Sequence, residues 1–379
     1  MRRVPFTTLE REHAELADGL RAAFEQVLRR SAFILGEEVS RFEAAWATAC
    51  GTAECVGVAS GTAALSLLFR AAGIRRGDEV IVPAHTYIAS ALALIDAGAV
   101  PVLCDVEEDT GLLDVEAAAA AVGPRTAAVL AVHLYGQMCD MPAVQRLAAR
   151  NGLALFEDAA QAHGAECHGR RAGGFGSGAA FSFYPSKNLG ALGDGGAICT
   201  NDRELAERAR RLRNLGQRRK GEHLVAGVNE RLDGLQAAFL RVKLSRLEAA
   251  NAARRRHAAC YSTIIDGRVR LLAEREATPC VYHVFPVRID ERDSVAETLR
   301  HAGIDTGVHY ARPLHHHPAL SGLAVSPGAL PNSEAWARQE LSLPMSPSLR
   351  SAEVEAAADA FVAAVTAMGA QRNGQLERV

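Results

Sequence analysis

The sequence has no long apolar run, no cysteines at metal-binding spacing and no excess of either charge. Because no apolar run is long enough to span a bilayer and the start, Met1-Arg2-Arg3-Val4-Pro5-Phe6, lacks a signal-peptide core, we expect a cytoplasmic protein without a membrane partner. A formal net charge of −2 over 379 residues gives no reason to expect a nucleic-acid partner. No internal repeat or low-complexity tract is present.

The eight cysteines show no Cys-x-x-Cys spacing, and several lie in apolar, strand-like runs such as Val102-Leu103-Cys104. This pattern favours buried free thiols in a reducing compartment over a zinc site or a disulfide framework. The run His315-His316-His317 could suggest metal binding. Adjacent histidines point in different directions in most backbones, and no carboxylate or thiol partner stands nearby, so we expect a loop or substrate role and no metal.

Hydrophobic residues make up 49% of the chain and charged residues 23%, an ordinary globular balance. Strand-like and helix-like segments alternate over residues 55–157, and the strands are continuously apolar. This pattern predicts an α/β fold with a mainly parallel sheet flanked by helices on both faces. In such sheets ligands bind at the carboxyl ends of the strands. Apolar residues at helical spacing also predict helices over residues 9–30 and 233–256.

The chain length predicts two domains, or one large domain with a smaller appendage. We place the large, ligand-binding domain with its N-terminal helix at residues 1–250 and a small α+β C-terminal domain at residues 251–379. Within the second region we expect a strand over residues 281–289, a helix over 295–302 and a terminal helix over 352–367.

The strongest chemical signal is Lys187, which follows a short apolar segment, 179–183, and precedes the glycine-rich turn 193–196. A lysine at the end of a buried strand is well placed to be a desolvated amine with a lowered pKa, able to form a Schiff base. For a lysine taken alone, the commoner interpretation is a solvated loop residue. The residues at the other strand ends decide between these two interpretations of Lys187.

Two strand ends could hold a charged ligand. Ser60-Gly61-Thr62 lies between a strand and a helix, where N–H groups and hydroxyls suit a phosphate, although a plain helix cap has the same appearance. Glu157 and Asp158 end a buried strand, and only one of them can face the site because side chains alternate along a strand. A carboxylate there could keep a pyridine nitrogen protonated, or it could cap a helix.

Two further strand ends are less specific. Tyr87 could stack on a flat ligand or pack in the core. The turn His133-Leu134-Tyr135-Gly136 could form a polar wall of the pocket or simply end its strand.

A phosphate cradle, a stacking ring, a pyridinium partner and a strand-end lysine together make a site for pyridoxal 5'-phosphate. A metal, a nicotinamide or a Ser-His-Asp triad would need a different set. The run Gly174-Phe175-Gly176-Ser177-Gly178 lacks the Gly-x-Gly-x-x-Gly spacing and the following helix of a dinucleotide site.

With these residues, the chain resembles a known family, the fold-type I, pyridoxal-phosphate-dependent nucleotide-sugar aminotransferases of the DegT/DnrJ class. The resemblance runs from the first helix into the C-terminal region and implies a large domain with a seven-stranded type of sheet. Its most specific stretches are 60–65, 157–164, 181–196 and 229–233.

The resemblance implies a role for each residue of the site. Lys187 would carry the cofactor as a Schiff base, Asp158 would pair with the pyridine nitrogen, Gln161 would lie by the ring hydroxyl and Tyr87 would stack on the ring. The phosphate would be held by Ser60, Gly61, Thr62 and Ser182, and by Asn229 of a partner subunit, which implies a homodimer with shared active sites. The sugar nucleotide would be contacted by Tyr184, Lys220, His309 and Tyr310.

Within the family, the chain is most similar to the branch that acts on dTDP-3-keto-6-deoxyhexoses. The implied reaction moves an amino group from L-glutamate to such a sugar, with pyridoxamine phosphate as the intermediate form of the cofactor. Three alternatives stay open: an aminotransferase for a 4-keto nucleotide sugar or an inosose, a sugar dehydratase, and a non-catalytic regulator that binds the cofactor. Dehydratases of this family have histidine in place of the lysine, so Lys187 is evidence against the dehydratase alternative.

Overall fold

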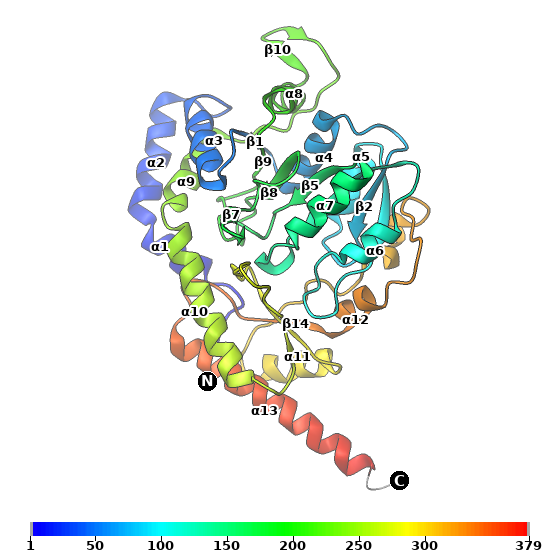
Figure 1. Ribbon diagram of the computed structural model, residues 1–379. Helices are drawn as coiled ribbons and strands as arrows, with labels where there is room; N and C mark the ends of the chain where they lie inside the picture. The colour runs from blue at the N-terminus through cyan, green and yellow to red at the C-terminus, as the bar shows by residue number, and fades with distance from the viewer. Residues whose placement is uncertain (1–2, 377–379) are drawn as a thin grey trace.

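The computed structural model describes residues 3–376, and it shows a large α/β unit joined to a smaller α+β unit (Figure 1). The predicted ranges 1–250 and 251–379 therefore include a few terminal residues that lie outside the described part. The boundary between the two ranges falls inside helix α10 (Leu247–Ile265), and the division at that residue stays a prediction.

The large unit is built on a seven-stranded sheet in the order β1-β9-β8-β5-β4-β2-β3. Its strands are β1 (Glu54–Val58), β2 (Glu79–Pro83), β3 (Val100–Cys104), β4 (Thr126–Val132), β5 (Ala154–Asp158), β8 (Gly178–Ser182) and β9 (Gly196–Thr200). Pairing is parallel from β3 across to β8, while β9 runs antiparallel to both of its neighbours. The mainly parallel α/β sheet predicted from sequence is confirmed.

Helices cover both faces of this sheet, because strands that are apolar on both sides must be buried on both sides. One face packs against α3 (Glu37–Cys50), α6 (Val115–Ala120), α7 (Met141–Asn151) and α9 (Gly234–Leu244). The other packs against α4 (Gly61–Ala72), α5 (Ala89–Asp96) and α8 (Arg203–Arg213). Two short hairpins lie outside the sheet, β6 (Glu166–Cys167) with β7 (Arg170–Arg171), and β10 (Gln217–Arg219) with β11 (Glu222–His223).

The smaller unit has a three-stranded antiparallel sheet, β12-β13-β14, with its own apolar core. Its elements are β12 (Arg270–Leu271), β13 (Phe285–Arg288), β14 (Glu340–Leu343), α10, α11 (Arg292–His301) and α13 (Ser351–Leu376). In Figure 1, α13 and α10 lie at the end of the molecule opposite the β10–β11 hairpin. The segment between α11 and α12 (Pro331–Gln339) returns to the large unit, where Leu314, Leu320 and Leu330 join its core.

Three predicted elements differ from the structure. The helix predicted over 9–30 is two helices, α1 (Leu9–Glu15) and α2 (Ala17–Arg30), which are separated at Leu16. The stretch predicted over 233–256 is likewise split into α9 and α10. The strand predicted over 281–289 is shortened to β13, because the N–H groups of Val281 and His283 donate to carbonyls of the turn at 135–136 in the large unit.

Candidate functional site

A cavity of about 520 Å³ opens at the carboxyl ends of the parallel strands. Most of the residues predicted from sequence line it together, although they come from distant parts of the chain. These residues are Ser60, Gly61, Thr62, Tyr87, Asp158, Gln161, Ser182, Tyr184, Lys187, His309 and Tyr310.

Lys187 lies in the loop after β8, and its side chain lines this cavity. Burial lowers the pKa of its amine to about 8, against the opposing effect of the Asp158 charge. Its Nζ lies 3.4 Å from Nε2 of the buried His283. About half of the amine is therefore uncharged near pH 8, and the uncharged form is the one that acts as a nucleophile and a base.

Asp158 and Glu157 point to opposite sides at the end of β5, as the alternation of side chains predicts. Glu157 is buried in the body of the protein, where it accepts hydrogen bonds from the N–H groups of Gly173 (3.0 Å) and Phe175 (2.7 Å). Asp158 lines the cavity, and its carboxylate accepts hydrogen bonds from Ser90 Oγ (2.8 Å) and the Ala160 N–H (3.2 Å). Burial raises the Asp158 pKa, and these two hydrogen bonds oppose that rise.

The N-terminus of α4 forms one wall of the cavity. Ser60 caps the helix, since its Oγ accepts a hydrogen bond from the Ala63 N–H at 3.1 Å. Gly61 lies against β8, and a Cβ at this position would be 2.6 Å from Cβ of Ser182. The close approach brings the Thr62 and Ser182 side chains to the same wall as the helix N-terminus, where an anion is favoured.

Gln161 has both ends of its amide engaged by the protein. Its Oε1 accepts from the Tyr135 N–H at 2.6 Å, and its Nε2 donates to the Tyr310 hydroxyl at 2.9 Å. The turn at Tyr135 therefore orients the cavity residue Gln161, in addition to ending strand β4. The Tyr87 and Tyr310 rings lie 5.3 Å apart, and Tyr87 is 54% exposed, so that its ring has a free face at the cavity.

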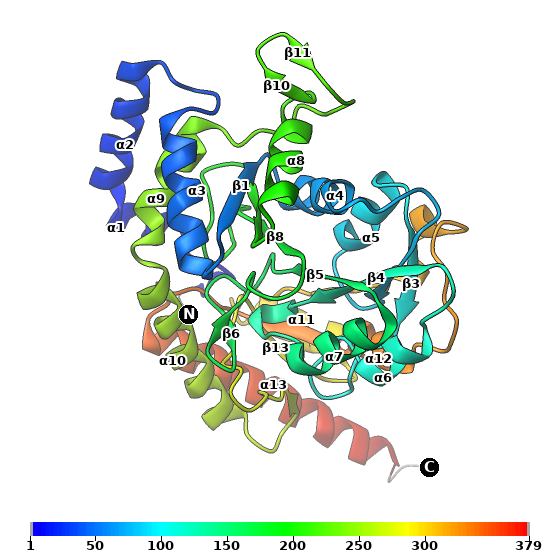
Figure 2. The same cartoon turned by 45° about the horizontal axis from the view of Figure 1, so that its top comes forward.

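Lys220 and Asn229 are the two predicted site residues that do not line the cavity of their own chain. Lys220 lies at the tip of the β10–β11 hairpin, which projects from the body of the molecule (Figure 2). Asn229 is exposed and forms an isolated antiparallel bridge with Asn214.

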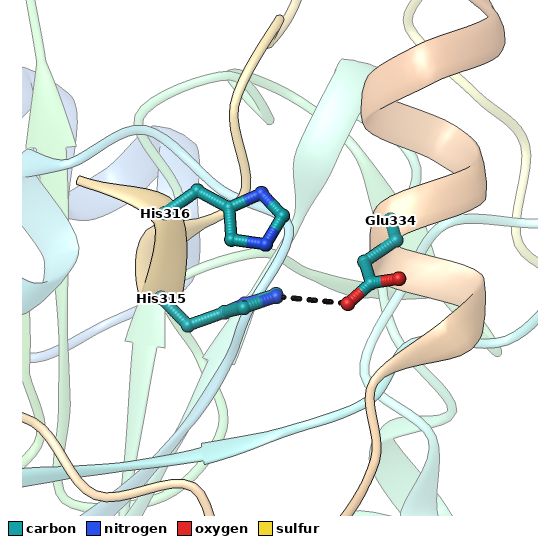
Figure 3. Close-up of side chains that lie close together, drawn as sticks. All are labelled: His315, His316 and Glu334. Carbon is teal, nitrogen blue, oxygen red and sulfur yellow. Dashed lines mark hydrogen bonds and ion pairs between the residues drawn. The ribbon is translucent and has the colours of Figure 1, made fainter.

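The histidine run does have a carboxylate nearby in space, which corrects the expectation from sequence. His315 Nε2 lies 3.3 Å from Glu334 of α12, and the possible ligand atoms of His315, His316 and Glu334 lie within 4.8 Å of one another (Figure 3). The sequence could not show this because the two segments are 19 residues apart. His315 Nδ1 is buried and has no hydrogen-bond partner among the described residues, whereas a metal-bound histidine usually donates from its second nitrogen. The expectation of no metal stays a prediction.

Several residues of the site were missed from sequence. Ser90 holds Asp158, His283 lies beside Lys187, and Asp194 lines the cavity within the glycine-rich turn. Of these three residues, only Asp194 had a local signal in the sequence, because it lies in the glycine-rich turn 193–196. Ser90 and His283 reach the site from segments whose pattern shows only a helix and a strand.

The profile of the DegT/DnrJ/EryC1/StrS aminotransferase family matches residues 15–362. The chain belongs to this family. It is 49% identical to the dTDP-3-amino-3,4,6-trideoxy-alpha-D-glucose transaminase of Streptomyces venezuelae over 349 residues, which is 92% of each protein. It is also 46% identical to the erythromycin biosynthesis sensory transduction protein EryC1 of Saccharopolyspora erythraea, over 91% of this chain and 95% of that protein.

Among solved structures, the fold matches S. venezuelae DesV in complex with a ketimine intermediate. The TM-score is 0.93 at 48% sequence identity, covering 95% of this chain and 98% of DesV. The chain is thus an aminotransferase with the fold-type I architecture, as its sequence predicted. None of the helices in the described range, 3–376, is both long and apolar enough to cross a membrane.

Proposed function

We propose that the chain uses pyridoxal 5'-phosphate to move an amino group from L-glutamate to a dTDP-3-keto-6-deoxyhexose, which gives a dTDP-3-amino-3,6-dideoxyhexose. The observation that carries this proposal is the cavity that holds a partly buried, low-pKa lysine and a buried carboxylate beside a hydroxyl-lined helix N-terminus. The substrate class is supported by the S. venezuelae relative, whose name specifies a dTDP-linked 3-amino sugar.

The residues present fit the cofactor in three places. The helix N-terminus at Gly61, where no Cβ could be placed without displacing Ser182, is a cradle for the phosphate. Asp158 offers a carboxylate to a protonated ring nitrogen, and Tyr87 offers a free ring face for stacking. When bound, the cofactor supplies an electron sink that stabilises negative charge next to the reacting nitrogen.

The protein groups then have distinct tasks. Lys187 would hold the cofactor covalently until the amino donor displaces it, and its free amine would then carry a proton from the donor's Cα to the cofactor carbon that bears the transferred nitrogen. Asp158 would hold the ring nitrogen in its protonated state. Tyr184, His309 and Tyr310 line the open part of the cavity and would contact the sugar nucleotide.

We also propose a homodimer with shared active sites, in a cytoplasmic protein. Lys220 and Asn229 do not line the cavity of their own chain, and contribution to the partner's cavity would give both a role. Exposed apolar side chains occur on the same part of the molecule, at Leu224 and Val225. Burial of such residues against a second copy would be favourable.

The proposed reaction is tested by supplying its two substrates separately. L-glutamate added to the yellow, cofactor-loaded protein should bleach the colour, and dTDP-3-keto-6-deoxyglucose should then restore it and yield an amino sugar. Persistent colour with glutamate would contradict the aminotransferase proposal and favour a non-catalytic regulator that binds the cofactor; one relative, EryC1, is named a sensory transduction protein. If glutamate bleaches the colour but the 3-keto sugar is not turned over, while a 4-keto nucleotide sugar or an inosose is, the substrate would be that other compound.

Shared sites are tested by mixing two inactive chains. Co-expressed Lys187→Ala and Asn229→Ala chains should form hybrid dimers with one fully intact site, so activity should recover to about a quarter of wild type on random mixing. Each variant expressed alone sets the baseline, and the absence of recovery in isolated hybrid dimers would contradict the sharing of sites.

A further inference from the structure

A buried relay connects the cavity residue His309 to two side chains of β14 in the smaller unit. His309 Nδ1 lies 2.9 Å from Ser342 Oγ, and the Ser342 hydroxyl donates to Glu340 Oε1 at 2.5 Å. Ser342 and Glu340 are both fully buried. The other carboxylate oxygen, Oε2 of Glu340, accepts the backbone N–H of His309 at 2.5 Å.

The donors and acceptors of this relay determine the protonation of the imidazole. A serine hydroxyl has one hydrogen, and Ser342 gives it to the carboxylate. The serine oxygen can therefore only accept from His309, so Nδ1 carries the proton and Nε2 has the lone pair. Burial, together with the positive charge of Lys187, lowers the His309 pKa to about 4, which keeps the ring neutral.

The His309 backbone and ring are fixed on their other sides. The Tyr135 hydroxyl donates to the His309 carbonyl at 2.7 Å and accepts from His85 Nε2 at 2.7 Å. The Phe6 ring stacks on the imidazole, with 5.8 Å between centroids and 17° between planes. Among the described residues, Nε2 of His309 has no hydrogen-bond partner, although the side chain lines the cavity.

We propose that Ser342 and Glu340 are positioning residues that hold His309 in its Nδ1–H tautomer, so that Nε2 presents a hydrogen-bond acceptor to a hydroxyl or amino group of the sugar nucleotide. The identity of that ligand rests on the proposed function, whereas the tautomer does not. Neither Glu340 nor Ser342 lines the cavity, so their effect on the substrate passes through His309.

The substitution Glu340→Gln tests this directly because it keeps the shape and reverses the relay. The amide oxygen can still accept the His309 N–H, but its NH₂ group must then donate to Ser342 Oγ. The Ser342 hydroxyl would turn to donate to Nδ1, and the proton would move to Nε2. His309 would thus present a donor to the cavity in place of an acceptor.

The readout is the ¹⁵N-imidazole spectrum of the holoenzyme labelled at histidine, with the His309 signals assigned by their loss in His309→Gln. Burial raises the Glu340 pKa to about 7, so spectra are recorded at about pH 8.5, where the carboxyl is ionised. We expect the Nδ1–H pattern in wild type, the Nε2–H pattern in Glu340→Gln and a mixture of both in Ser342→Ala. Ser342→Thr, which keeps the hydroxyl, should restore the wild-type pattern.

Kinetics provide the second readout. In Glu340→Gln the KM for the sugar nucleotide should rise about tenfold, the size expected for one lost hydrogen bond, while bleaching by glutamate stays within about twofold. Ser333→Ala is the matched control, because it removes another buried serine that donates to a carboxylate (Asp105 Oδ1, 2.7 Å) away from the cavity. It should change neither readout.

An Nε2–H or doubly protonated His309 in wild type, or an unchanged pattern in Glu340→Gln, would overturn the proposal. If Glu340→Gln does not fold, Ser342→Ala against Ser342→Thr decides the question, and an unchanged His309 spectrum in Ser342→Ala would then overturn it. Failure of the aminotransferase proposal itself would show separately, as wild-type protein that neither bleaches with glutamate nor turns over a keto sugar.

Discussion

Ser90→Ala should slow the half-reaction with glutamate by about tenfold or more without loss of the fold. Ser90 donates to Oδ2 of Asp158 at 2.8 Å, both residues are buried, and the only other donor to that carboxylate among the described residues is the Ala160 N–H. A hydrogen bond to a charged group contributes about 1.5–3 kcal/mol. Since about 1.4 kcal/mol corresponds to a factor of ten in rate, the lower value alone gives a tenfold loss if the carboxylate acts in the rate-limiting step.

The assay is stopped-flow absorbance of the cofactor-loaded protein mixed with saturating L-glutamate. Ser66→Ala is the control, because Ser66 also donates to a carboxylate, Asp96, but lies outside the cavity. Asp158→Ala gives the upper limit of the effect. A Ser90→Ala rate within about twofold of wild type, beside a strongly impaired Asp158→Ala, would refute the argument that Ser90 maintains the Asp158 charge.

Three other substitutions probe the cradle, the ion pair between α1 and α13, and the thiols. Gly61→Ala should weaken cofactor binding at least tenfold in a fluorescence titration, because its Cβ would lie 2.6 Å from that of Ser182, and unchanged affinity would count against the cradle. Glu353→Gln should destabilise the protein by about 1–2 kcal/mol in urea unfolding at neutral pH, because the Arg11 hydrogen bond and charge lower the Glu353 pKa to about 2. A depressed carboxyl pKa stabilises the fold above the unfolded value and loses this effect as pH falls through the folded value, so the difference should shrink between about pH 5 and pH 2, and a constant difference would contradict the assignment. Native protein should react with a thiol reagent fastest at Cys260, since the other seven cysteines are buried, and Cys260→Ser should remove that fast reaction.

The sequence was sufficient for the sheet and for the strand-end residues of the cavity, for one physical reason, whereas cavity residues such as His309 and Tyr310 were expected only from the family resemblance. In a parallel sheet the carboxyl ends of the strands meet at one edge, so residues that follow strands, such as Lys187 and Asp158, are brought together by topology alone. The alternation of side chains also correctly separated Asp158 from Glu157. These inferences needed only local patterns and the parallel pairing of the strands.

The residues that sequence reasoning missed depend on long-range contacts. Ser90 is 68 residues from Asp158, and His283 is 96 residues from Lys187, so no local pattern connects either pair. Glu340 and Ser342 reach His309 across an antiparallel bridge between Gly307 and Ser342. The same limit applies to His315 and Glu334, whose proximity follows from the way η2 (Leu314–His316) packs beside α12.

The most direct test of the account is nitrogen transfer by wild type and by Lys187→Ala. Wild-type protein is incubated with ¹⁵N-labelled L-glutamate and dTDP-3-keto-6-deoxyglucose, and the sugar nucleotide is analysed by mass spectrometry. We predict a ¹⁵N-labelled dTDP-3-amino sugar from wild type, and neither product nor yellow lysine-bound cofactor from Lys187→Ala, whose cavity lacks the buried amine. Labelled product from Lys187→Ala at a rate near that of wild type would contradict the central role of this lysine.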